Sequence, residues 1–219
     1  MHKLSVHVSS NFQEDCLDSG DIILPAKGET LSLFQVYFQY VGQFQHIIYE
    51  PHSRILVDHV YDETDASTAP PGLALVLSVI AIATILEPIR GRLDEVLPVH
   101  KHRLKISAAY IRAAMDCLEQ QRRMMNHTIE SVQAMIILLF LICHIEGFSH
   151  RYRTLVAEAV VVSQSLGLHF VDSGNADEDS VVTEMKRRVW WYLAATDWMV
   201  STVEGKTFRS YSSAVDRRC

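Results

Sequence analysis

The pattern of apolar and polar residues predicts α-helices over most of the chain. From Thr128 to Gly147 apolar residues lie on nearly every side of the helix, which is typical of a helix buried all round. Two further helices are predicted between Ser149 and Gly167 and between Ser180 and Gly205. In the last of these, Trp190 and Trp191 point about 100° apart, so both are buried only if neighbours cover more than one face.

Residues that favour helix ends flank these three segments. The hydroxyl oxygens of Ser and Thr can accept hydrogen bonds from the free N–H groups of a first turn. Glycine takes, at low cost, the left-handed conformation that ends many helices. The expected N-terminal caps are Thr128, Ser149 and Ser180, and the expected C-terminal stops are Gly147, Gly167 and Gly205.

The N-terminal half shows the same helical spacing. A helix is predicted over about 29–48 and ends by Pro51, a short one follows from Ser53 to about Tyr61, and longer ones cover 72–86 and about 99–125. The apolar face expected for the first of these consists of Leu33, Tyr37, Tyr40, Phe44 and Ile47. No segment alternates well enough to predict a strand longer than a few residues. The predicted fold class is therefore all-α, an irregular multi-helix bundle of antiparallel helices.

Composition narrows the functional classes. The chain has 219 residues and a net charge of −6, which argues against a free-standing nucleic-acid binder because such proteins need a basic face. Its four cysteines are scattered and no pair has metal-ligand spacing, so we expect no metal or other cofactor in this chain. The apolar runs 72–86 and 135–145 are shorter than the roughly 18–20 residues of a membrane-spanning helix, and no membrane association is expected.

Three motifs in the second half resemble the fungal-specific transcription factor domain, the middle homology region of zinc binuclear cluster regulators. Residues 128–134 and the leucine-rich run after them are similar to the family's "T-x-E-x-x-Q-A-L-x-L-L" helix. Residues 163–169 resemble its "A-x-x-L-G-L-H" ending. Residues 184–191, then Asp197 and 205–208, resemble its "E-x-R-R-R-x-W-W … D … G-R-P" helix. Three such matches in order are much more specific than one.

The resemblance implies a domain organisation. Residues 1–24 are expected to be a weakly structured lead-in, 25–208 an incomplete regulatory (middle homology) domain, and 209–219 an unstructured tail. Because helices that the family places later are not expected in 209–219, we predict that the apolar helices over 72–86 and 135–145 leave apolar surface exposed. The family's six-cysteine zinc cluster is absent from this sequence. No zinc-binding or DNA-binding residue is therefore assigned here, and DNA contact is expected only through a missing zinc-cluster module.

The function that the resemblance implies is the regulatory core of a fungal transcriptional regulator that modulates RNA polymerase II transcription in the nucleus. Its partners would be another regulator subunit or the transcription machinery, and the chain is not expected to be an enzyme. The alternative is a stand-alone helical interaction protein that pairs with full-length regulators. A six-cysteine exon upstream of Met1 would favour the first interpretation. The family-signature core residues are Gln133, Gly167, Leu168, His169, Arg188, Trp190, Trp191, Asp197 and Gly205.

A third possibility is an all-helical, magnesium-dependent enzyme similar to the terpene synthases. Residues 177–184 resemble that family's "N-D-x-x-S-x-x-x-E" motif, but Ala176 stands where its asparagine ligand would be. The carboxylates Asp58, Asp62 and Asp65 do not form a "D-D-x-x-D" motif, and the pattern straddles a loop and a helix start. The sequence thus favours no catalytic role.

Other candidate sites have more ordinary explanations. The basic run 186–188 could contact phosphates, but three cations on an acidic chain are more often a solvated helix face. The tryptophans of the last helix could line a ligand pocket, although core packing is the commoner role. His144 and His150, with Glu146 between them, do not have a good metal-ligand spacing.

Asp197 lies among apolar residues of its helix. A buried carboxylate without a partner costs several kcal/mol, so we expect a hydrogen-bond donor from a neighbouring helix. The candidates are Arg151, Arg153 and Ser163 on the preceding helix. In the alternative arrangement Asp197 faces water.

Overall fold

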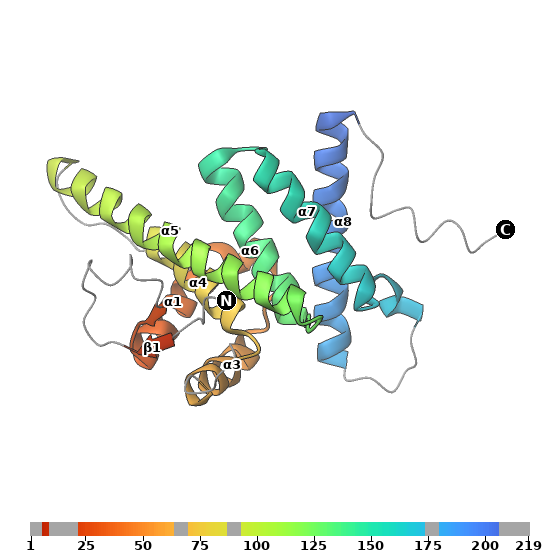
Figure 1. The fold of residues 1–219 in the computed structure, drawn as a ribbon, viewed down its shortest axis with the longest axis horizontal. Helices are drawn as coiled ribbons and strands as arrows, with labels where there is room; N and C mark the ends of the chain where they lie inside the picture. Colours follow the sequence, from red (N-terminus) through yellow and green to blue (C-terminus); the bar gives the residue numbers. More distant parts are fainter. Residues whose placement is uncertain (1–5, 9–21, 64–69, 87–92, 174–179, 206–219) are drawn as a thin grey trace. The chain divides into compact units, whose positions relative to one another are not determined.

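The computed structural model describes residues 6–8, 22–63, 70–86, 93–173 and 180–205 (Figure 1). The chain divides into two compact units, which are treated separately below. Unit 1 comprises residues 1–44 and 49–126, and unit 2 comprises residues 45–48 and 127–219. The predicted all-α class is confirmed. The division into two units was not predicted, because the apolar pattern of one helix does not show which other helices pack against that helix.

Unit 1 contains helices and one small strand pair. Its helical elements are α1 (Lys27–Tyr37), the π-helix η2 (Phe38–Gly42), the first part of α2 (Gln43–Gln45), α3 (Glu50–Asp62), α4 (Leu73–Leu86) and α5 (Leu93–Arg123). The strands β1 (Val6–Val8) and β2 (Ile22–Leu24) pair in parallel, with Val6 opposite Ile22. This two-stranded sheet is the only one among the described residues. A three-residue strand is too short to show alternation in the sequence, and these two strands agree with the prediction that no strand is longer than a few residues.

Helix α4 is the core of unit 1. Every residue from Leu73 to Ala83 is buried, and α4 packs against α1 and along α5. Its polar residue Ser78 donates to the Ala74 carbonyl at 2.7 Å, and Ser107 of α5 donates to the Ala81 carbonyl at 2.8 Å. Burying hydroxyls is tolerated when they are hydrogen-bonded in this way. The expectation that the run 72–86 leaves apolar surface exposed is therefore wrong for residues 72–83, whereas Thr84, Ile85 and Leu86 are partly exposed.

The first helix differs from the continuous one predicted over 29–48. The π-turn η2 contains one more residue per turn than an α-helix, so it shifts the buried positions by about one residue. Val41 and Gln45 are buried, whereas Tyr40 and Phe44 of the predicted apolar face are exposed. The helix ends at Gln45, before His46, whose φ of +49° lies in the left-handed region.

Two other boundaries in unit 1 also moved. Pro51 was expected to end a helix but lies in the first turn of α3, where its missing N–H removes no helical bond. Ser53, expected as a cap, lies inside that helix and donates to the Glu50 carbonyl at 2.6 Å. Helix α5 begins at Leu93, six residues before the predicted start.

Unit 2 is built from three long helices that follow the predicted pattern closely. They are α6 (Ile129–Glu146), α7 (His150–Ser165) and α8 (Ser180–Glu204), with the 3₁₀ helix η3 (Leu168–Ser173) after α7. Helices α6 and α7 form an antiparallel hairpin, and α8 runs beside α7 and contacts η3 (Figure 1). The predicted irregular, antiparallel packing is thus present within this unit.

The predicted helix ends of unit 2 are largely confirmed. Ser149 accepts a hydrogen bond from the Tyr152 N–H at 3.2 Å. Thr128 stands at the N-cap position of α6 as predicted, where the Ser131 hydroxyl accepts a hydrogen bond from the Thr128 N–H at 3.1 Å. The three stop glycines have the positive φ that glycine tolerates best; they are Gly147, Gly167 and Gly205. The capping role of Ser180 stays a prediction, because the residues just before it lie outside the described part of the chain.

Helix α6 is longer than the apolar run noted in the sequence. It has 18 residues and is long and apolar enough to cross a membrane by length and composition alone. However, 61% of it is buried inside the protein, with every residue from Ser131 to Leu139 buried. This helix is the core of unit 2. The expectation that the run 135–145 leaves its apolar surface exposed is wrong for most of the run, but Phe140 and Cys143 are partly exposed and Ile145 is exposed.

Candidate functional site

The nine family-signature residues all lie in unit 2. They lie in α6, in the turn after α7, in η3, in α8 and just after the end of α8. The structure buries four of them almost completely: Gln133, Leu168, Trp190 and Asp197. Arg188, Trp191 and Gly205 are exposed, so the prediction that they are core residues is wrong.

Gln133 binds a distant segment of the chain. Its side-chain amide donates to the backbone carbonyl of Ile47 at 2.5 Å. Ile47 is fully buried, and Gln45 beside it donates to the Tyr192 hydroxyl at 3.4 Å. Residues 45–48 are thus tied to α6 and α8 of unit 2 by two side-chain hydrogen bonds. The sequence does not reveal this role, because the acceptor is a backbone carbonyl, which every residue type carries.

The turn after α7 places a histidine against α8. Gly167 takes a φ of +73°, which lets the chain leave α7 and enter η3. Leu168 is then buried, and the ring of His169 lies 5.7 Å from that of Trp190, centroid to centroid. The signature residues of this turn therefore join η3 to α8 by packing.

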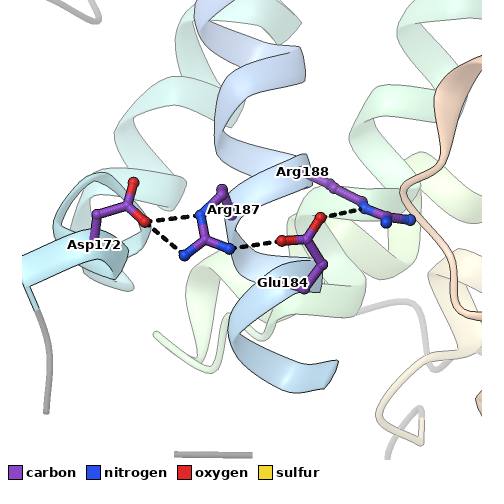
Figure 2. Close-up of polar contacts among 4 residues, drawn as sticks. All are labelled: Asp172, Glu184, Arg187 and Arg188. Atoms are coloured by element: carbon purple, nitrogen blue, oxygen red, sulfur yellow. Dashed lines mark hydrogen bonds and ion pairs between the residues drawn. The ribbon is translucent and has the colours of Figure 1, made fainter. Parts of the chain in front are cut away.

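The basic run of α8 forms an ion-pair network with two carboxylates (Figure 2). Arg187 donates to Asp172 of η3 at 2.7 Å and to Glu184 at 2.6 Å, and Arg188 donates to the other oxygen of Glu184 at 2.8 Å. Hydrogen bonds from Arg188 and Arg187 lower the pKa of the Glu184 carboxyl below its usual value. The two arginines and two carboxylates carry no net charge together, which makes this face a poor phosphate-binding surface.

The three tryptophans of α8 have different environments. Trp190 is 8% exposed, whereas Trp191 is 52% and Trp198 39% exposed. The core role predicted for all three is right for Trp190 only. The reason is geometric: neighbouring elements cover one face of α8, and Trp191 points about 100° away from Trp190.

Asp197 is fully buried, so the arrangement in which it faces water is wrong. Of the three predicted donors, Ser163 gives its hydroxyl to the Ala159 carbonyl at 2.7 Å, and Arg151 pairs with Glu146 at 3.0 Å. Arg153 is half-buried on α7, the helix that packs against α8. The cross-helix pairing of Asp197 stays a prediction, with Arg153 as the best candidate.

The residues considered for metal-dependent catalysis do not come together in the described part of the chain. No group of three or more potential metal ligands occurs there. Glu184 is held by two arginines, and Asp58 pairs with Lys27 at 2.8 Å. His144 bonds to the Phe140 carbonyl at 2.7 Å, within its own helix. The carboxylates Asp65 and 177–179 lie outside the described residues.

Unit 1 contains a groove of about 380 Å³, within the size range of small-molecule sites. Its apolar wall includes Leu33, Val36 and Ile106, and its polar side chains include Glu29 and Arg103. The Glu29 carboxylate accepts a hydrogen bond from the Ala26 N–H at 3.2 Å, so it has a structural role at the start of α1. No local sequence pattern predicts this groove, because residues of three separate helices, α1, α4 and α5, line it.

Comparison with known proteins identifies the family. The profile of the Fungal specific transcription factor domain matches residues 34–215. The chain therefore belongs to the fungal-specific transcription factor domain family, and the resemblance of the sequence motifs is confirmed.

Named relatives agree with this assignment. The chain is 33% identical over 199 residues to the probable transcription factor lepB of Aspergillus flavus, covering 86% of this chain and 35% of that protein. It is 28% identical over 199 residues to the agnestins biosynthesis cluster transcription factor AgnL11 of Paecilomyces divaricatus, covering 86% and 28%. It is 26% identical over 200 residues to the transcription factor TAS2 of Pyricularia oryzae, covering 87% and 25%.

The chain thus spans about a third or less of the length of these relatives. No solved structure matches it significantly.

Proposed function

We propose that this chain is the regulatory core of a fungal transcriptional regulator, which modulates RNA polymerase II transcription in the nucleus. The observation that carries the proposal is that four of the nine signature residues of a transcription factor family lie in the packing core of unit 2. Gln133, Leu168, Trp190 and Asp197 come from three elements of unit 2 and are all buried. A unit with such a packed core presents a fixed surface to which other proteins can bind, and regulation by protein binding requires no catalytic residue.

In this proposal DNA contact belongs to a zinc-cluster module outside these 219 residues, on the same protein or on another regulator subunit. Two observations support a separate DNA-binding module: Arg187 and Arg188 of α8 are paired with carboxylates, and the chain has a net charge of −6.

A tethered reporter tests the proposal. The 219-residue chain is fused to a heterologous DNA-binding domain in fungal cells, and transcription from a promoter that carries the matching sites is measured. We expect reporter mRNA to change several-fold relative to the DNA-binding domain alone. The same fusion with Asp197→Ala, which disrupts the core of unit 2, should lose the effect. Unchanged reporter mRNA with a stable, nuclear fusion protein would contradict the proposal.

A further inference from the structure

Residues 45–48, called the strap below, belong to unit 2, although the residues on both sides of them in the sequence belong to unit 1. The strap is not helical after Gln45. The side chains of Gln45 and Ile47 are buried, with 4% and 0% of their surface exposed, whereas His46 between them is exposed. The strap therefore inserts two side chains, one residue apart, into unit 2.

Two helices of unit 2 bind the strap through side chains. The Gln133 amide of α6 donates to the Ile47 carbonyl at 2.5 Å, and the Tyr192 hydroxyl of α8 accepts from the Gln45 amide at 3.4 Å. The first bond goes to a main-chain carbonyl, so it does not depend on the residue type that supplies it. Selectivity comes from the buried aliphatic side chain and from the side-chain donor two positions before it. Peptide-binding domains combine main-chain hydrogen bonds with side-chain pockets in the same way.

The middle residue fixes the shape of the strap. His46 has a φ of +49°, in the left-handed region. Glycine takes this conformation most easily, and asparagine and histidine take it more often than most other residues do. Proline cannot take it, because its ring holds φ near about −65°. A segment that fits the site therefore carries a side-chain donor, then glycine, asparagine or histidine, and then an aliphatic residue.

The strap can leave unit 2 without separating the helices that bind it. Helix α7 packs against both α6 and α8, so the helices are held together by contacts of their own. The aromatic residues on either side of the strap, Phe44 and Tyr49, are 61% and 41% exposed. Release of the strap therefore does not pull a large buried side chain out of a core on either side of it.

We propose that unit 2 carries a peptide-binding site, which the strap occupies in this structure and which a segment of a partner protein with the same three-residue pattern can occupy in its place. Because the strap is part of the same chain, its effective concentration at the site is high. The partner segment therefore binds tightly only when the strap has been released. The proposal does not depend on a role in transcription.

Fluorescence anisotropy with the full chain tests the proposal. The probe is a fluorescein-labelled peptide with the sequence of residues 42–50. In Ile47→Asp the strap carries a charge that is costly to bury without a partner, so the strap leaves the site. This variant should bind the peptide about tenfold or more tightly than the wild type does. Ile55→Asp is the matched control, because Ile55 is 62% exposed on α3, and it should bind the peptide as the wild type does.

Further changes test the individual contacts. Adding Gln133→Leu to Ile47→Asp should weaken peptide binding several-fold, because the donor to the main-chain carbonyl is lost. A peptide with His46→Pro cannot take the left-handed conformation, and a peptide with Ile47→Asp lacks the aliphatic side chain. Neither peptide should bind detectably to the Ile47→Asp chain. Circular dichroism checks that each variant is folded.

Thiol labelling tests the site in a chain whose strap is still bound. In Ile47→Cys the thiol is protected while the strap is in place and reacts only when the strap leaves. An excess of the unlabelled peptide should raise the labelling rate at position 47 several-fold, because the peptide occupies the vacated site. The His46→Pro peptide should leave the rate unchanged. Peptide mapping by mass spectrometry separates this position from the four native cysteines.

Four results would overturn the proposal. A folded Ile47→Asp chain binds the peptide no more tightly than the wild type does, or Ile55→Asp increases binding equally. The His46→Pro peptide binds as tightly as the probe. The peptide leaves the labelling rate at position 47 unchanged, and this measurement alone decides if Ile47→Asp does not fold.

Discussion

The side-chain amide of Gln133 donates a hydrogen bond to the backbone carbonyl of Ile47, 86 positions earlier in the chain. Both residues are buried, so neither group can turn to water instead. This bond ties residues 45–48, which lie between two segments of unit 1 in sequence, to the core helix of unit 2. Gln133, which is part of the family motif, thus has a structural role as the donor to the Ile47 carbonyl.

Replacing Gln133 with Leu should destabilise the protein, because the buried Ile47 carbonyl would lose its donor. The expected loss in unfolding free energy is about 1–3 kcal/mol. Urea denaturation followed by circular dichroism measures it. Gln39→Leu, which changes an exposed glutamine of η2, is the control and should stay within about 0.5 kcal/mol of wild type. Equal stability of wild type and Gln133→Leu would show that the bond contributes nothing.

The predicted partner of Asp197 can be tested by a double-mutant cycle. Asp197→Ala should destabilise the protein by about 3–5 kcal/mol if it leaves the half-buried Arg153 without its carboxylate. Arg153→Ala should be similarly costly, and the double variant should cost clearly less than the two single costs added together. Strictly additive costs would remove Arg153 as the partner and leave another donor to be found.

Acidification should weaken the ion-pair network at the start of α8. The pKa of Glu184 is lowered in the folded protein by hydrogen bonds from Arg188 and Arg187. The pKa of a glutamate carboxyl in the unfolded chain is about 4.3. When the pKa is lower in the folded protein, the ionised carboxylate stabilises the fold at pH values above the unfolded pKa, and this stability is lost as the pH falls through the folded pKa.

NMR titration of the Glu184 carboxyl should therefore give a midpoint below the usual range. In an Arg187→Gln/Arg188→Gln variant the midpoint should rise towards the ordinary value. An identical midpoint in both proteins would mean that the arginines do not hold the carboxylate in solution.

The thiol of Cys117 should be inert in the folded protein. It is fully buried in α5, and burial, with a smaller effect of Asp116, raises its pKa to about 12. Because the thiolate is the reactive form, a maleimide reagent should label Cys117 only after unfolding. Peptide mapping by mass spectrometry checks this, and rapid native labelling at Cys117 would show that α5 opens locally.

Sequence-specific DNA binding by this chain alone is not expected. Arg187 and Arg188 are paired with carboxylates, and the chain carries a net charge of −6. Fluorescence anisotropy titrations at physiological salt should show no saturable, sequence-dependent binding. Nanomolar binding to one DNA sequence would refute this prediction.

The sequence predicted most where local chemistry sets the structure. Ser149, Gly147 and Gly167 act at the helix ends as expected, because capping and left-handed turns depend on a few neighbouring residues. Prediction failed at the π-turn of residues 38–42, where one additional residue in a turn moved the buried face from Tyr40 to Val41. The regular periodicity of an α-helix, about 3.6 residues per turn, does not predict this shift of the buried face.

The signature residues show the same limit. Their motifs identified the family, but the exposure of Trp191 beside the buried Trp190 depends on which face of α8 its neighbours cover. The contact of Gln133 with Ile47 joins residues 86 positions apart, and no local sequence pattern predicts such a long-range contact. Sequence therefore predicted which elements form, and the structure was needed to show which residues they bring together.

The most direct test of a transcriptional role is the mRNA profile of cells that lose and regain this chain. The coding region is removed from its own organism and restored as wild type or as Asp197→Ala, with protein levels matched. We predict that removal changes the mRNA levels of a limited set of genes, and that wild type restores them while Asp197→Ala does not. Identical mRNA profiles in all these strains would contradict the account.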